Sequence, residues 1–256
     1  MSDNVLGFST EPASNTEFVP VVRYDAKAGR MSRMERVEGV NGWETTRIFI
    51  PSDQFKALAD FENVEVGPVN FNTGGAPSFL MVRRDLLVAE KIAMPERPDA
   101  NYKPGIRFML KLSKDCAGDG KPVREIASNA RAFLSEIAVV IKQYLDEKAQ
   151  NPGKLPVLAL DGDPYPVKSG SGTKSSTNFH PKFKIIGWAP RGDLVYIPKT
   201  LKAMEQSTSV KGATVNGANN GAKQSDDWDV APSTGAQRAE APKQKPAQTV
   251  SADDFG

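Results

Sequence analysis

The chain has 256 residues, a formal net charge of +2 and a charged fraction of 25%. Hydrophobic residues make up 39% of it, and no apolar run approaches the roughly 20 residues that a membrane-spanning helix needs. One cysteine, Cys116, excludes an internal disulfide, and one histidine, His180, excludes a multi-histidine metal site. Because the first residues also lack the basic start and apolar core of a signal peptide, we expect a cytoplasmic protein.

The pattern along the chain predicts a β-rich α+β protein. A polar, flexible arm is expected over residues 1–16, a short helix over 54–61 and a long exposed connection over 88–104. Strands are predicted, from the β-branched and aromatic runs and the turn residues between them, over residues 18–24, 31–37, 43–50, 64–71, 78–83, 106–112, 155–160, 180–188 and 194–197.

One principal helix is predicted over about residues 123–148. Ile126, Phe133, Ile137 and Ile141 recur at helical steps and form one apolar face, and Asn151-Pro152-Gly153 stops the pattern. Strands, one helix and further strands are the order of an OB-like five-stranded barrel, whose helix lies between the third and fourth strands. The extra strands would precede the barrel in the chain. Other mixed β-rich folds share this order.

The C-terminal part repeats one short motif. Asp226-Asp227-Trp228 and Asp253-Asp254-Phe255 each place two acids before an aromatic residue, and no other aromatic residue occurs from about residue 205 onward. The surrounding Ala, Gly, Ser, Asn, Gln and Pro residues cannot build a core, so the aromatic residues are not there to stabilise a fold. We therefore divide the chain into the arm, an OB-like nucleic-acid-binding domain over 17–200, and a disordered linker and acidic tail over 201–256, which would act as a peptide ligand.

Most enzyme classes lack their motifs in this chain. There is no HExxH, no paired CxxC and no G-x-S-x-G elbow. The segment 170–177 resembles a phosphate-binding loop, but Thr173 stands before Lys174 where that loop requires glycine. Its small residues suit either a looser contact with phosphate groups or a plain surface loop. We expect no catalytic residues, no metal site and no cofactor.

Two stretches interleave basic and aromatic residues. The candidate DNA-binding residues are Arg23, Tyr24, Lys27, Arg30, Arg33, Arg36, Trp43 and Arg47 in the first stretch, and Lys168, Lys174, Phe179, His180, Lys182, Lys184 and Trp188 in the second. Cations of this kind neutralise phosphates, and exposed rings stack on bases at about 1–3 kcal/mol each without reading sequence. The opposing interpretation is that the rings belong to the core and the cations to a solvated face.

These features together resemble the single-stranded-DNA-binding proteins of bacteria and tailed phages, which join a basic β-rich domain to a low-complexity linker and an acidic tip with an aromatic residue. Residues 19–37 and 168–194 are also similar to phage-encoded replication proteins. The resemblance implies a protein of DNA replication, recombination and repair, located in the host cytoplasm if phage-encoded. It also implies that Asp253, Asp254 and Phe255 recruit partner proteins and compete with DNA. Here Gly256 follows the aromatic residue on which such tips usually end.

Two other classes of function remain open from the sequence. One is a phage structural or assembly protein that self-associates and has no DNA affinity. The other is a metal-dependent DNA-processing enzyme that uses acidic residues scattered along the chain. The sequence does not decide whether the protein is a homo-oligomer.

Overall fold

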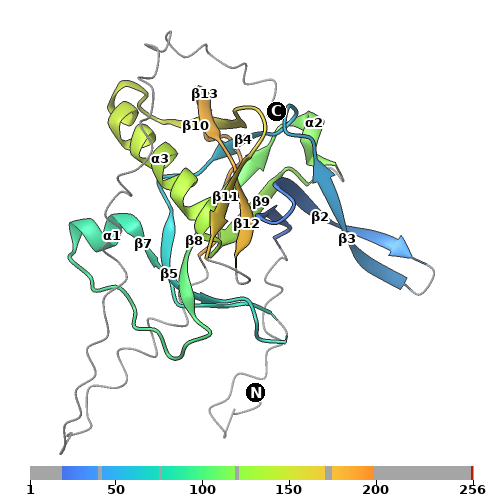
Figure 1. Ribbon diagram of the computed structural model, residues 1–256. Coiled ribbons are helices and arrows are strands. Elements are labelled where there is room, and N and C mark those ends of the chain that lie inside the picture. Colours follow the sequence, from blue (N-terminus) through green and yellow to red (C-terminus); the bar gives the residue numbers. More distant parts are fainter. Residues whose placement is uncertain are drawn as a thin grey trace, which may run out of the picture.

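A computed structural model describes residues 19–39, 42–74, 76–118, 121–170, 175–198 and Phe255 (Figure 1). These residues form a β-rich structure with a large mixed sheet and one main helix, α3 Arg131–Glu147. Two short helices, α1 Arg84–Ala89 and α2 Lys114–Ala117, lie between strands. The sheet comprises β1 Val21–Asp25, β2 Arg30–Gly39, β3 Gly42–Ile50, β4 Lys56–Ala59, β5 Glu65–Asn70, β6 Ser78–Phe79, β7 Val82–Arg83, β8 Lys103–Leu112, β9 Val123–Ser128, β10 Lys154–Leu160 and β13 Phe183–Pro190.

The main path of the sheet runs β13-β10-β4-β8-β9-β1-β2-β3, and β5 pairs with the other half of β8. Its pairs are antiparallel apart from β1 with β9, which run parallel. The hairpin β2–β3 projects away from the rest of the sheet (Figure 1). A separate two-stranded hairpin, β11 Tyr165–Ser169 with β12 Ser176–His180, lies in the connection between β10 and β13.

The principal helix begins later than the sequence pattern predicts. Residues 123–128 form strand β9, and α3 starts only at Arg131. Strand β9 pairs with β8 on one edge and with β1 on the other, and Arg124, Glu125 and Ile126 are all buried. A strand buried on both faces loses the alternation that normally identifies it, so Ile126 matched the helical period by coincidence.

Two other predictions are wrong, and one element was not predicted. The short helix expected over 54–61 is a turn followed by β4, in which Ala57, Leu58 and Ala59 are all buried. Residues 194–197 follow an irregular path instead of a strand, and the hairpin β11–β12 was not predicted. The strands predicted over 64–71 and 155–160 are confirmed as β5 and β10.

The inner face of the sheet holds the larger hydrophobic core, which α3 covers. Phe133, Ile137 and Tyr144 of α3 are buried in it together with strand residues such as Phe108. The rings of Phe133 and Phe183 meet edge to face there, with centroids 5.6 Å apart. This face is closed by the α-helix because α3 presents one continuous apolar stripe to it.

The outer face is closed differently, by the irregular segment 191–198. A buried arginine, Arg107, anchors that segment. Its guanidinium forms ion pairs with Glu65 and with Glu125, the latter with Nη2 and Oε2 at 3.0 Å. Nη2 also donates a 2.8 Å hydrogen bond to the carbonyl of Ile197, and the hydroxyl of Tyr196 donates to Glu65 Oε1 at 2.7 Å. The charges are thus taken out of water but remain paired, which is the condition under which such burial is tolerated.

Candidate nucleic-acid interface

The two basic stretches of the sequence meet where the hairpin β11–β12 touches the turn after β1. The backbone N–H of Phe179 donates to the carbonyl of Ala26 at 2.7 Å. In return the hydroxyl of Tyr24 donates to the carbonyl of Phe179 at 2.9 Å. Lys27 Nζ adds a 3.3 Å bond to the carbonyl of Thr177. Residues about 150 positions apart are therefore fixed side by side.

Glycine permits this close approach at one position of the turn. Gly29 has a φ of +66°, and a Cβ built there would lie 2.8 Å from Cγ of Pro164 and 3.0 Å from Cβ of Phe179. A larger residue would meet both a strained backbone conformation and a steric clash. The turn sequence is thus adapted to holding the hairpin against β1.

A groove of about 320 Å³ runs beside this contact. Three exposed cations line it, Arg23 from β1, Lys27 from the turn and Arg47 from β3. One carboxylate, Asp25, lies among them at 3.5 Å from Arg47. Asn178 of the hairpin adds an amide that can donate and accept hydrogen bonds. The excess of positive charge suits an anionic ligand that runs along the surface.

An exposed ring lies on the same face of the projecting hairpin. Phe49 is 46% exposed, and Arg47 lies two residues before it in β3, so the two side chains share a face. The guanidinium of Arg30 lies 5.5 Å from the centroid of the Phe49 ring. An exposed ring between two cations is the arrangement that single-strand binders use to stack a base beside a phosphate. The sequence pattern predicted no role for Phe49, although its two-residue spacing from Arg47 places both side chains on one face of the strand.

A second exposed ring belongs to the hairpin β11–β12. Tyr165 is 37% exposed, and Lys182 Nζ lies 5.7 Å from its ring centroid. Its hydroxyl donates to Glu136 Oε1 of α3 at 2.6 Å. His180 lies beside it, with ring centroids 5.2 Å apart and Nδ1 at 3.3 Å from the same carboxylate oxygen. His180 therefore positions the hairpin on α3 and does not line the groove.

Two aromatic rings among the predicted binding residues lie in the core. Tyr24 is 9% exposed, and burial, followed by the nearby charges of Asp25 and Glu136, raises its pKa. Trp188 is 6% exposed and stacks on Tyr144 with centroids 5.8 Å apart. Neither ring is open to a base in this structure. For these two rings the alternative interpretation given by the sequence, that aromatic residues of the basic stretches belong to the core, describes their positions.

Several predicted cations lie away from the groove. Arg33 pairs with Glu35 and points to the carbonyl of Cys116, and Lys184 pairs with Asp161 at 2.8 Å. Lys168 is exposed on β11. Of the other predicted residues, those that lie outside the described part of the chain are Lys174, Asp226, Asp227, Trp228, Asp253 and Asp254, together with the side chains of Arg36 and Trp43.

Phe255 of the predicted partner-binding tip is described, and it is buried. Its ring is 6% exposed and packs on the outer face of the sheet with Leu58, Met109 and Leu194. The sequence predicted this residue as a ligand for another molecule, and nothing in its local pattern indicated a contact with its own domain.

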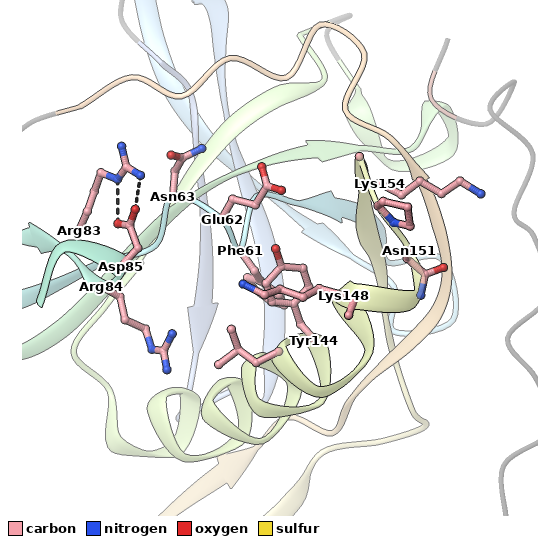
Figure 2. Close-up of a pocket in the computed structure, with 14 residues that line it drawn as sticks. Phe61, Glu62, Asn63, Arg83, Arg84, Asp85, Tyr144, Lys148, Asn151 and Lys154 are labelled. Atoms are coloured by element: carbon pink, nitrogen blue, oxygen red, sulfur yellow. Dashed lines mark hydrogen bonds and ion pairs between the residues drawn. The ribbon is translucent and has the colours of Figure 1, made fainter. Parts of the chain in front are cut away.

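A larger cavity of about 500 Å³ lies at the end of α3 (Figure 2). Arg84 of α1, Lys148 after α3 and Lys154 of β10 line it, and none of the three forms an ion pair with another described residue. Burial, followed by the charges of Glu62 and Asp60, raises the pKa of Tyr144 in its wall to about 12. Glu62 and the ion pair of Arg83 with Asp85 also line the cavity, which keeps an excess of positive charge that the sequence pattern did not indicate.

Within the described ranges, no group of three or more His, Cys, Asp or Glu side chains is arranged to hold a metal ion, and no helix combines the length and apolar character needed to cross a membrane. No protein-family model matches the chain, and neither the curated proteins nor the solved structures contain a match to it.

Proposed function

We propose that this protein binds single-stranded DNA without sequence preference, through the outer surface of β1–β3 and the hairpin β11–β12. The observation that carries the proposal is the groove in which Arg23, Lys27 and Arg47 meet Asn178. Phe49 beside it supplies an exposed stacking surface. Cations along a groove with an exposed ring beside it suit sequence-independent binding of single strands.

We further propose that the sheet is an OB-like barrel with strands added before it in the chain. In support, five strands in the order β4, β8, β9, β10 and β13 carry α3 between the third and fourth. Their antiparallel pairs β4–β8, β8–β9, β4–β10 and β10–β13 agree with that topology. The fifth strand would close such a barrel on β9, but the added strand β1 pairs with β9 in parallel instead. The connection between the fourth and fifth strands, which often contacts oligonucleotides in OB folds, is here the hairpin β11–β12.

The tail motifs complete the proposal. Asp226-Asp227-Trp228 and Asp253-Asp254-Phe255 would recruit replication and recombination proteins, since an acidic segment with one aromatic residue suits a basic, apolar pocket. The protein would then coat single-stranded DNA in phage replication and recombination while presenting these motifs to partners.

Fluorescence anisotropy with a labelled oligo-dT at two salt concentrations tests the DNA affinity. We expect binding that weakens steeply as salt rises, and the variants Arg23→Ala and Arg47→Ala should each reduce the salt slope by about 0.7. Lys142→Ala is the matched control, because Lys142 is an exposed cation on α3 whose partner is Asp146. Affinity no tighter than millimolar at low salt would overturn the proposal.

Three further measurements separate the rival functions. Competition between single-stranded and duplex DNA measures the preference for single strands. Stable oligomers on a sizing column without DNA affinity would indicate a structural or assembly protein. Degradation of the oligonucleotide that requires Mg²⁺ would indicate a DNA-processing enzyme.

A further inference from the structure

The outer face of the sheet contains a recess that is filled by a residue from the far end of the chain. Phe255 belongs to the cluster of Leu58, Leu155, Val157 and Leu194 and is 6% exposed. These partners come from β4, β10 and the segment after β13, so the ring is held by separate parts of the fold. Burying a phenyl ring among aliphatic side chains removes a large apolar area from water, which favours the docked position.

The rim of the recess is polar and positive. Lys111 lines it and is held by Asp193, with Nζ and Oδ1 at 2.6 Å. Lys114 lines its other side and is exposed, without an ion pair to another described residue. Two aspartates precede Phe255 in the sequence, so an apolar floor with a cationic rim matches the chemistry of the tip.

We propose that this recess is a receptor site for an acid-acid-aromatic tip and that its occupant is the tip of the same chain. Leu194 and Tyr196 pack in the same cluster as Phe255, just before the connection that begins at residue 199. Both ends of that connection therefore meet at the recess, and the tip can dock without a second molecule. Docking within one chain does not depend on protein concentration.

The consequence is a competition for the tip between its own domain and its partners. A protein that binds Phe255 must first draw it from the recess, so the recess sets how available the tip is. The inference is independent of the proposed DNA binding, because no residue lines both the recess and the groove of Arg23, Lys27 and Arg47 among those described.

A labelled peptide with the sequence of residues 247–256 tests whether the recess binds a tip reversibly. The full-length variant Phe255→Ala should bind this peptide, and the wild-type protein should bind it at least tenfold more weakly because its own tip occupies the site. A peptide with alanine in place of the phenylalanine is the control and should not bind. Equal binding to both proteins, or binding to neither, would overturn the inference.

A second test leaves Phe255 in place, in case its removal prevents folding. A carboxypeptidase should release residues 256 and 255 slowly from the wild-type protein, because the docked end is protected. Lys114→Glu reverses a charge on the rim at an exposed position and should accelerate release at least threefold. Lys91→Glu, at an exposed position outside both sites, should leave the rate unchanged. Equal rates for all three proteins would contradict the docking.

Sedimentation over a hundredfold range of concentration identifies the source of the tip. A monomer that retains protection of its C-terminal residues at every concentration supports docking within one chain. A dimer that the substitution Phe255→Ala abolishes would overturn this, because the recess would then hold the tip of a second copy.

Discussion

The two faces of the sheet are closed by different means. The inner face is covered by a long helix, α3, that contributes a continuous stripe of apolar side chains. The outer face is covered by an irregular segment, the buried ion pairs of Arg107 and one distant ring, Phe255. The first arrangement depends on shape and area and the second on a few specific partners. We therefore expect closure of the outer face to depend on fewer contacts than closure of the inner face.

The largest expected effect is on the inner face. Phe133→Ala removes a fully buried ring that contacts Tyr24 and Phe183, and we expect it to lower the free energy of unfolding by about 4 kcal/mol. Urea denaturation measures this loss. A change below about 1 kcal/mol would contradict the importance assigned to this face.

On the outer face, Arg107→Ala leaves the carboxylates of Glu65 and Glu125 buried without their cation. We expect a loss of about 3 kcal/mol, comparable with a core substitution. If the double replacement of both carboxylates by their amides in the Arg107→Ala background restores most of the stability, the loss came from unpaired charge. If it restores none, packing of the arginine itself is the cause.

Above pH 10, the free energy of unfolding is expected to depend on the ionisation of the buried tyrosine hydroxyls. Burial raises the pKa of Tyr144 from 10.0 to about 12, so the folded state retains its proton while the unfolded state loses it. The contribution of the buried Tyr144 hydroxyl to the free energy of unfolding is complete below pH 10 and is lost as the pH rises towards 12. Tyr144→Phe should make stability fall less steeply between these values in urea titrations at several pH values. If the free energy of unfolding falls with pH as steeply in the variant as in the wild type, the Tyr144 hydroxyl ionises equally in the folded and unfolded states.

The smallest expected effect on stability is at the exposed ring beside the groove. Phe49→Ala should change the free energy of unfolding by no more than about 0.5 kcal/mol, because the ring is 46% exposed. It should weaken binding to oligo-dT by about 1–3 kcal/mol if the ring stacks on a base. A variant that binds as tightly as the wild type would remove Phe49 from the proposed interface.

The sequence predicted the parts of this molecule whose pattern is local. Strand β10 and the body of α3 follow from apolar runs and helical spacing within one segment. The start of α3 could not be predicted, because β9 is buried on both faces by β8 and β1, and that burial arises from distant pairing. Without its neighbours, such a strand has the same hydrophobic pattern as a helical turn.

The candidate site also combines features that a local pattern predicts with features that depend on distant contacts. Basic and aromatic residues were recognised around Arg23 and Lys168, but only tertiary contacts decide that Arg47 lines a groove while Arg33 pairs with Glu35. The docking of Phe255 depends on side chains of four strands and a loop. No local pattern could reveal a recess that exists only after those elements have assembled.

The position of Phe255 also affects the order in which the chain can complete its structure during synthesis. Residues of the inner core have all been made once Trp188 has left the ribosome, whereas the outer cluster must wait for residue 255. Until then Leu58, Met109 and Leu155 lack one of their contacts, and their apolar surface is exposed to chaperones and to other nascent chains. Docking of Phe255, and with it complete closure of the outer face, can therefore occur only after the rest of the outer cluster has been made.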